Sequence, residues 1–421
     1  MHRAAVVLLI AGVLATEHAI AQPPPHSPPG GTFRQITARS GVAEIIEQEY
    51  RQDRKWWLSG LYLMDLDGDG NLDFVTGAHG GGGPIAALGD GKGGFNPGGS
   101  ILTGVTRNET NIHYADVRGN GRIDLIVHWG RYDNPAGQSR VFFNDGKMSF
   151  TDVTKQIGLS DQDGFAIKGV GDVNQDGFPD LLVLENKRPE IYLNDGLGHF
   201  RKKQGALIGM ETARKPVYVS WGLAVVTDLD SDGVADILWN GRNFLWVLRG
   251  NGDGTFTYRN KAWGIEDYSK ATVDEGLCFG DIDGDGALEI IGFAADRERA
   301  RVNVYHNELP KRNWINIRPI GAPGNRVASG AKIRISASGE PHRLLWCEQV
   351  QIIASQSAHS DYSHAQTERH FGLGDRAVVD VSVEFYPSRK KVEKKGIRAN
   401  RTIVCSEESG QIGEAQTNGD K

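Results

Sequence analysis

The chain has 421 residues, a formal net charge of −6 at pH 7 and 55 glycines. So small a negative charge argues against a nucleic-acid-binding protein, which would carry a basic domain or stripe. The glycine content is roughly twice the average usage and favours a fold with many tight turns, and therefore many short strands.

The first residues have the layout of a secretory signal peptide. A basic start precedes an apolar run over residues 4–15, and a small-x-small cleavage sequence, Ala-Ile-Ala, ends at residue 21. The apolar run is too short to span a bilayer as a mature helix, and no later run is long enough. We therefore predict a signal peptide over 1–21, a proline-rich linker over 22–32, and a secreted or periplasmic protein without a transmembrane segment.

A nine-residue phrase, rich in aspartate and glycine, recurs five times between residues 33 and 309. We number its copies loop 1 (65–73), loop 2 (116–124), loop 3 (172–180), loop 4 (228–236) and loop 5 (281–289). Each copy is followed by an apolar or β-branched run, which indicates a strand.

A second phrase falls between these loops. The sequences beginning at Asn144, Asn194 and Asn251 are tight-turn sequences flanked by strand-forming residues. One repeat therefore predicts about four short strands, which is typical of a β-propeller blade. A blade cannot bury its faces alone, so the blades are expected to stack on one another.

Oxygen-bearing side chains occupy positions 1, 3, 5 and 9 of most loops, and glycine stands at position 6. A hard dication such as Ca²⁺ takes about six to eight oxygen ligands, and the glycine allows the sharp turn that points successive oxygens inward. The predicted calcium ligands are Asp65, Asp67, Asp69 and Asp73 in loop 1; Asp172, Asn174, Asp176 and Asp180 in loop 3; Asp228, Asp230, Asp232 and Asp236 in loop 4; and Asp281, Asp283, Asp285 and Glu289 in loop 5.

Loop 2 departs from this pattern, with Arg118 at position 3 and Asn120 at position 5. The arginine can take the place of an ion by forming charge-assisted bonds with Asp116 and Asp124. Metal is therefore disfavoured in loop 2, and we expect about four structural calcium ions in the other loops.

An EF-hand begins with a similar loop, but it needs a bidentate glutamate at position 12 and a helix on each side. The residues at position 12 are Thr76, Val127, Val183, Trp239 and Gly292. None of them can ligate in that way, so the pattern indicates strand-loop-strand units.

The repeat ends near residue 310, and strand-like runs continue beyond it. They predict a small all-β domain over 310–407, or extra strands that complete the propeller, followed by a disordered tail over 408–421. Cys347 and Cys405 lie in this region and either pair in an oxidising compartment or remain free thiols.

The five loops and their trailing strands resemble the FG-GAP/VCBS repeats of integrin α-like propellers. Five C-terminal stretches resemble the ASPIC/UnbV domain, which accompanies such repeats in cartilage acidic protein and in bacterial secreted proteins: 313–317, 324–333, 370–374, 384–388 and 399–403. Arg389 stands where that domain has a glycine after Trp-Pro-Ser. The resemblance implies an all-β fold, a propeller over 33–309 closed by five to seven blades, and loop aspartates that bind structural Ca²⁺ on one face.

No motif for a nucleophile, a phosphate loop or a catalytic zinc site occurs in the chain. The favoured function is therefore an extracellular binding or adhesion module for a protein or a glycan. A secreted hydrolase or lyase with its site in the axial cleft is the alternative. A structural role within a larger secreted assembly is the third possibility.

Overall fold

The computed structural model describes residues 37–41, 44–45, 48, 57–79, 85–102, 110–129, 138–213, 215, 223–241, 244–265, 273–281, 285–295, 300–326, 328, 330–338, 344–349 and 369–415. The predicted signal peptide and linker lie outside the described residues. Within these ranges, helix is confined to α1 (Thr37–Ser40), residues 44, 45 and 48, and the 3₁₀ turn η1 (Met210–Thr212). None of the described helices is long and apolar enough to cross a membrane.

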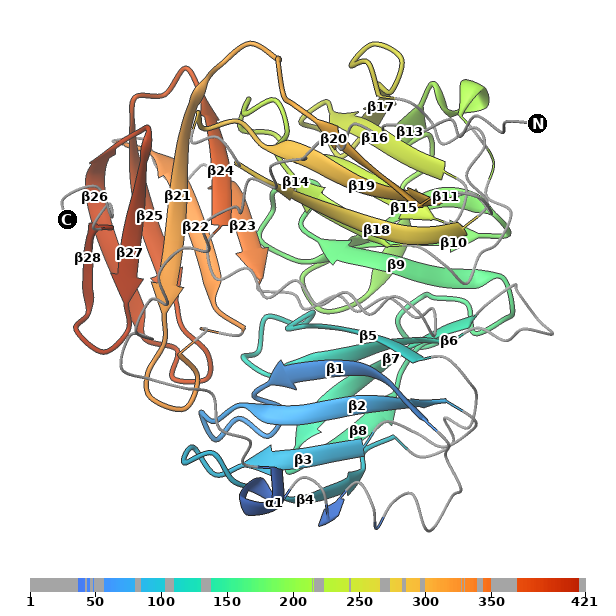
Figure 1. Cartoon of the computed structure of the whole chain (residues 1–421), viewed down its shortest axis with the longest axis vertical. Coiled ribbons are helices and arrows are strands. Elements are labelled where there is room, and N and C mark those ends of the chain that lie inside the picture. The colour runs from blue at the N-terminus through green and yellow to red at the C-terminus, as the bar shows by residue number, and fades with distance from the viewer. Residues whose placement is uncertain are drawn as a thin grey trace, which may run out of the picture. The chain divides into compact units, whose positions relative to one another are not determined.

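The repeats form five successive groups of strands, which we call blades 1 to 5 (Figure 1). Blade 1 holds β1 (Trp57–Met64), β2 (Asp73–His79), β3 (Ile85–Gly89) and β4 (Phe95–Ser100). Blade 2 holds β5 (Thr110–Ala115), β6 (Asp124–Trp129), β7 (Gln138–Gly146) and β8 (Ser149–Asp152). Blade 3 holds β9 (Phe165–Gly171), β10 (Asp180–Glu185), β11 (Arg188–Asn194) and β12 (Phe200–Lys202).

Blade 4 holds β13 (Leu207–Ile208), β14 (Ala224–Thr227), β15 (Asp236–Gly241), β16 (Phe244–Gly250) and β17 (Phe256–Tyr258). Blade 5 holds β18 (Val273–Gly280), β19 (Glu289–Ala295) and β20 (Ala300–Tyr305). Neighbouring strands within a blade are antiparallel, except that the short β13 runs parallel to β17. Blades 2 and 3 are joined into one sheet by a single parallel pair, Gln138 with Phe165.

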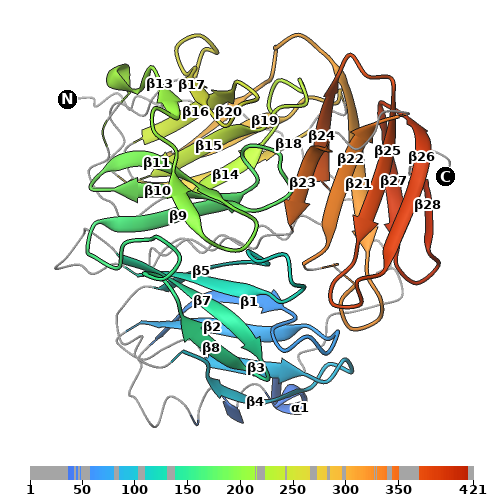
Figure 2. The ribbon, with the colours of Figure 1, turned by 180° about the vertical axis from the view of Figure 1, so that it is seen from behind.

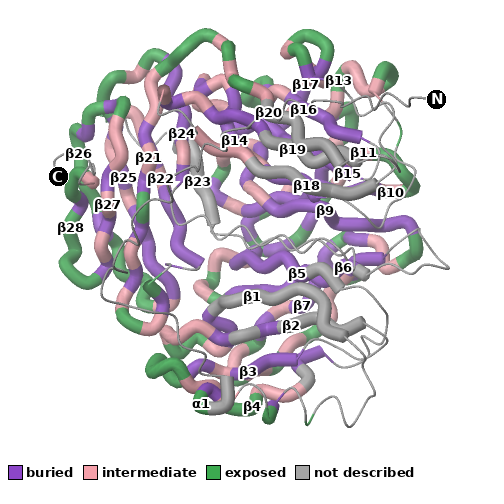
Figure 3. The backbone as a smooth tube through the Cα atoms, viewed as in Figure 1, coloured by how far each residue is buried: buried purple, intermediate pink, exposed green. Residues whose placement is uncertain are grey.

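Four large apolar cores are each shared between two consecutive blades, and a smaller cluster of Ile85 and Ala87 with Ile45 lies on blade 1. Val127 of blade 2 packs in a cluster with Val75 of blade 1, whereas the neighbouring Ile126 packs in a cluster with Ile167 of blade 3. The same alternation continues into blade 4, where Trp239 packs towards blade 3 and Leu238 towards blade 5. Successive side chains of a strand point to opposite faces, so blades 2, 3 and 4 each bury both faces between their neighbours (Figure 3).

Two further sheets follow the repeats and lie side by side in both views of the chain (Figures 1 and 2). One has the order β24 (Arg369–Gly374), β21 (Asn313–Ile320), β27 (Arg401–Ser406), β28 (Gln411–Glu414). The other has the order β23 (Leu344–Gln349), β22 (Lys332–Ala337), β25 (Val378–Glu384), β26 (Lys391–Arg398). Their facing side chains form one buried core, so we call the pair the C-terminal sandwich.

The predicted fold class is confirmed: the described chain is all-β, with propeller-type blades followed by a small all-β unit. One finer expectation is wrong, and one alternative that the sequence left open is decided. Residues 411–414 are not disordered, because they form β28, which pairs with β27. Cys405 is a buried free thiol on β27, whereas Cys347 lies on β23 of the other sheet, so the disulfide alternative fails. Burial raises the pKa of the Cys405 thiol to about 12.

Candidate metal-binding loops

Every loop joins the first and second long strands of its blade, and its turn is held by the aspartate at position 1. Asp65 of loop 1 accepts hydrogen bonds from the backbone N–H groups of Gly68, at 2.8 Å, and Gly70, at 3.0 Å. The glycine at position 6 donates in the same way in loops 2 to 5, at 2.8–2.9 Å. Gly70 has a φ of 91°, a left-handed conformation that disfavours other residues.

The acidic residue at position 9 ties its loop to the rest of the blade. Asp180 of loop 3 accepts the N–H of Val173, at 2.9 Å, and the N–H of Asn194 at the end of β11, at 2.8 Å. Asp73 and Asp236 make the corresponding pairs of bonds in loops 1 and 4. These carboxylates are fully buried, so the backbone bonds fix their positions before any ion arrives.

Loops 1 and 4 bring three carboxylates together. Oxygens of Asp65, Asp67 and Asp73 lie within 4.8 Å of one another, and so do oxygens of Asp228, Asp230 and Asp236. Burial raises the pKa of Asp65 to about 7 and that of Asp73 to about 6, because a desolvated carboxylate is costly to ionise. These buried clusters can hold a metal ion, which would supply the missing positive charge.

Position 5 lies apart from these clusters. The Asp69 side chain in loop 1 accepts from the Asn71 amide at 3.0 Å. In loop 4, the guanidinium of Arg249 pairs with both Asp230 and Asp232. Sequence reasoning missed Arg249. The signal that could have identified it is its position, a basic residue near the end of β16, where the chain returns to the end of the blade that carries the loop.

Loops 3 and 5 gather fewer of their predicted ligands. Burial raises the pKa of Asp172 to about 7, and Asn174 turns its amide to Asp176 at 2.9 Å. In loop 5, the buried Glu289 lies 3.2 Å from Nδ1 of His306, and Lys311 pairs with Asp285 at 2.8 Å. Asp283 of loop 5 lies outside the described residues, and Asp281 accepts the backbone N–H groups of Asp285, at 3.1 Å, and Gly286, at 2.9 Å.

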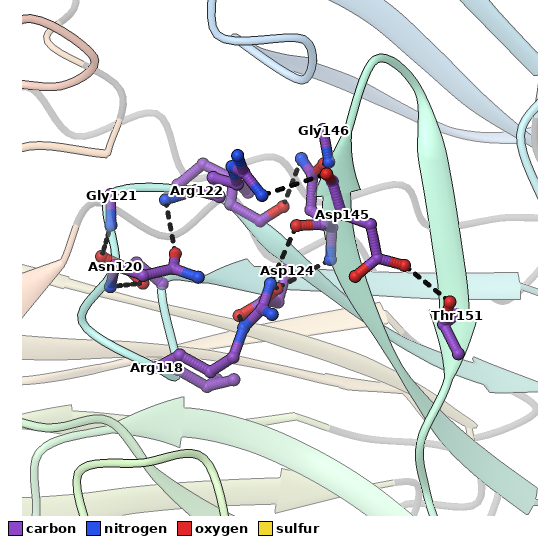
Figure 4. A network of polar contacts seen from close by, with 12 residues as sticks. Arg118, Asn120, Gly121, Arg122, Asp124, Asp145, Gly146 and Thr151 are labelled. Carbon is purple, nitrogen blue, oxygen red and sulfur yellow. Dashed lines mark hydrogen bonds and ion pairs between the residues drawn. The ribbon is translucent and has the colours of Figure 1, made fainter.

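Loop 2 contains cations of the chain itself, and Arg118 bonds to Asp124, one of the two carboxylates expected from the sequence. The Arg118 guanidinium bonds to Asp124 Oδ1 at 2.7 Å (Figure 4) and to the carbonyl of Asn144 at 2.9 Å. It also lies 4.2 Å from the ring centre of Phe143. Asp116 pairs with Lys332 of the C-terminal sandwich at 3.2 Å. These residues do not fit a divalent metal ion, because positive groups already neutralise both carboxylates.

A polar cluster that the sequence did not reveal lies between blades 2 and 3. His128 contacts the Ser139 hydroxyl through Nδ1, at 3.0 Å, and the Lys168 ammonium through Nε2, at 3.3 Å. The Ser139 oxygen also accepts the N–H of Ile167 at 2.8 Å. Because an ammonium can only donate, Nε2 of a neutral His128 accepts from Lys168, and its Nδ1–H donates to the Ser139 oxygen. All three side chains are at most 1 % exposed. A substrate therefore has no route to this hydroxyl in the described structure.

A cavity of about 590 Å³ lies between blades 3 and 4. Its wall includes the β10–β11 hairpin with Lys187 and Arg188, and the segment after β13 with Met210 and Lys215. The three basic side chains are exposed. Loop 3 precedes β10 and the β10–β11 hairpin follows it, so the two turns lie at opposite ends of this strand. The cavity therefore lies at the end of the blade opposite the loops.

The fold and its loops define an all-β repeat protein that places an acidic loop at the same corner of each blade. A family model described as FG-GAP-like repeat matches residues 65–127, 172–222 and 228–292, and one described as ASPIC and UnbV matches residues 321–412. The chain is an FG-GAP-like repeat protein with a C-terminal ASPIC and UnbV domain. No curated protein matches it.

Several solved structures resemble this fold at low identity. An Agrocybe aegerita lectin specific for non-reducing terminal N-acetylglucosamine is 20% identical over 60% of this chain and 82% of its own, with a TM-score of 0.31. A Bacillus licheniformis rhamnogalacturonan lyase is 14% identical over 80% of this chain and 71% of its own, with a TM-score of 0.36. The V. cholerae biofilm matrix protein Bap1 is 13% identical over 81% of this chain and 59% of its own, with a TM-score of 0.32.

Proposed function

We propose that this protein is a secreted or periplasmic, calcium-binding β-propeller that acts as a binding or adhesion module for an acidic glycan. Calcium occupies loops 1, 3, 4 and 5 and rigidifies the loop face. The glycan binds at the opposite end of the blades, in the cavity between blades 3 and 4. The proposed glycan binding rests on this cavity, which combines an apolar wall with exposed cations.

The calcium half is supported by the chemistry of the loops. Three carboxylates that are close together and largely buried repel one another and have lost water, so a dication that replaces water with fixed oxygens stabilises them. Loop 1 offers two buried carboxylates and the half-buried Asp67 on one short segment. A hard oxygen-only donor set favours Ca²⁺ over zinc or copper.

Calcium is tested by thermal unfolding of the mature chain in EGTA and in millimolar CaCl₂, together with its metal content. We expect about four bound ions and a clear rise in Tm, because an ion that binds only the native state stabilises it by mass action. Asp67→Ala should remove one ion, whereas Asp90→Ala, in an exposed turn of the same blade, should remove none. An unchanged Tm without bound calcium would refute this half.

The ligand class follows from the cavity wall. Lys187 and Arg188 follow one another on the hairpin, and Lys215 faces the same cavity from blade 4. Met210 and Leu207 add an apolar surface against which a sugar ring can pack. Carboxylate groups on a sugar complement these cations, so a uronate-containing oligosaccharide fits better than a neutral one.

A glycan array with the calcium-loaded protein tests the ligand. We expect binding to uronate-containing oligosaccharides that weakens at high salt. Lys187→Asn combined with Arg188→Ala should lower affinity at least about tenfold, and asparagine tolerates the left-handed backbone of residue 187. Arg201→Gln, which removes an exposed cation from β12, is the matched control. Binding confined to neutral glycans, or equal binding by both variants, would refute the acidic ligand.

The enzyme alternative needs a nucleophile or an acid–base pair that a substrate can reach. Ser139 and His128 have suitable chemistry, but both are fully buried. The described residues therefore favour the binding module over a hydrolase or lyase.

A further inference from the structure

The C-terminal sandwich contacts several of the acidic loops directly. Its Gly374 donates a backbone hydrogen bond to the Ser231 carbonyl of loop 4 at 2.9 Å. The Gly324 carbonyl accepts the N–H of Leu72 in loop 1 at 3.2 Å. Lys332 reaches Asp116 of loop 2. The face that carries the loops is therefore at least partly covered by this chain's own C-terminal domain.

Two glycines make this approach possible. A Cβ at Gly372 would lie 2.0 Å from Oδ2 of Asp228 in loop 4. A Cβ at Gly324 would lie 2.5 Å from the Gly70 carbonyl oxygen in loop 1. Contacts shorter than 3 Å leave no room for a side chain, so the backbone of the sandwich lies directly on loops 1 and 4.

Loop 2 is contacted in a different way, through charge. Asp116 is 3 % exposed and pairs with the ammonium of Lys332, which is 6 % exposed and begins strand β22. The Arg389 guanidinium lies 3.8 Å from the same carboxylate oxygen. The second carboxylate of the loop, on Asp124, is held by Arg118. A dication at this position would add charge to a site that is already neutralised.

We propose that loop 2 is a metal-independent docking site, at which Lys332 of the C-terminal domain supplies the positive charge that an ion supplies in an intact loop. The buried pair with Asp116 holds the domain on the loop face whether or not calcium is present. This inference rests on the contacts of loop 2 and does not depend on calcium in the other loops.

A double-mutant cycle tests the pair. Lys332→Met keeps the aliphatic stem and removes the charge, and Asp116→Asn removes its partner. Each single change should lower Tm in EGTA by several degrees, because a buried charge loses its partner. The double variant should fall by less than the sum of the two. Additive losses would overturn the proposal. Lys395→Met, at an exposed position on β26, is the matched control and should leave Tm unchanged.

Contact between the C-terminal sandwich and the loops is measured separately, by amide hydrogen exchange at Leu72 and Gly374. The N–H groups of these residues form hydrogen bonds between the sandwich and loops 1 and 4. Exchange at both should be faster in Lys332→Met than in Lys395→Met. Equal exchange in the two variants would mean that the pair does not hold the domain on the loops.

Rebuilding the loop tests the substitution of charge for metal. Arg118→Asp with Asn120→Asp restores aspartate at positions 3 and 5. With Lys332 present, the bound calcium should equal that of the wild type; with Lys332→Met added, it should rise by one ion per chain. An extra ion while Lys332 is present, or none in the triple variant, would overturn the proposal. A wild type without any calcium would refute the proposed function but leave the Tm cycle and the exchange readout valid.

Discussion

At the scale of single residues, burial sets the charge state of His113 on β5. The side chain is 2 % exposed, and its Nδ1 has no hydrogen-bond partner among the described residues. Burial, reinforced by the Lys168 ammonium, lowers the pKa of His113 from 6.5 to about 3. His128 faces the same ammonium from β6. A second positive charge in this cluster is unfavourable, so His113 stays neutral in the native protein.

We expect His113 to make the protein acid-sensitive. Between pH 6.5 and about 3 the unfolded chain binds a proton at this site and the native chain does not, so stability falls as the pH is lowered through this window. His113→Gln cannot titrate, and its Tm should fall less than that of the wild type between pH 7 and pH 4. Thermal unfolding across this range measures the difference. Parallel pH curves for the two proteins would contradict the prediction.

Gly372 is a second residue at which a small change, the addition of one methyl group, is expected to lower stability. Gly372→Ala places a methyl group 2.0 Å from Asp228 Oδ2 and 2.3 Å from the Ser231 Cα. Because both neighbours belong to loop 4, we expect a loss of about 1–3 kcal/mol. Gly413→Ala on β28, where a Cβ meets nothing within 4 Å, is the control. Urea unfolding should separate the two variants, and equal stability would mean that the sandwich does not lie against loop 4.

At the scale of elements, an asparagine at the end of a blade's third strand links consecutive repeats. Asn194 at the end of β11 donates to the Val117 carbonyl of loop 2, at 2.8 Å, and to the Pro179 carbonyl of its own loop, at 3.0 Å. Asn144 and Asn307 make the equivalent pair of bonds from blades 2 and 5. The bond into the preceding loop sets the register of one blade on the next.

Replacing this asparagine should weaken the contact between blades 2 and 3. Asn194→Ala leaves two buried carbonyl groups without their side-chain donor, and we expect a loss of about 1–3 kcal/mol in urea unfolding. Asn251→Ala changes an exposed asparagine that bonds only to nearby threonines, and it should cost no more than about 0.5 kcal/mol. A loss at residue 194 as small as that at residue 251 would count against the bridging role.

At the scale of the whole described molecule, four large apolar clusters lie between consecutive blades. Each cluster takes its side chains from two consecutive blades, and Tyr386 of the C-terminal domain joins the cluster of blades 1 and 2. Loss of one blade therefore exposes apolar surface on its neighbours. This arrangement couples the blades to one another and to the C-terminal domain.

We expect a single cooperative thermal transition that includes the blades and the C-terminal sandwich. Calorimetry should give a calorimetric enthalpy close to the van't Hoff enthalpy, and calcium should move the transition as one unit. A separate low-temperature transition, assigned to the sandwich by its hydrogen exchange, would show that the shared contacts do not couple the two parts.

Much of the fold could be predicted because local patterns repeat. The glycine at position 6 and the aspartate at position 1 are neighbours along the chain, and their hydrogen bond forms within the loop. The apolar runs after each loop form second strands such as β6 and β10. The prediction for the second phrase was less accurate, because it treated Asn251 as the equivalent of Asn194. In the structure the equivalent residue is Gly250, since the backbone N–H groups of Asn194 and Gly250 both donate to the position 9 carboxylate of their blade.

The sequence by itself determined the strands, the loop turns and the departure of loop 2, because these depend on residues a few positions apart. Only the tertiary structure decided what neutralises Asp116, since Lys332 lies 216 residues further along the chain. It alone also joined His128, Ser139 and Lys168 from three strands, and placed Gly372 against Asp228. Burial and long-range charge depend on how distant segments pack, and no local pattern records that packing.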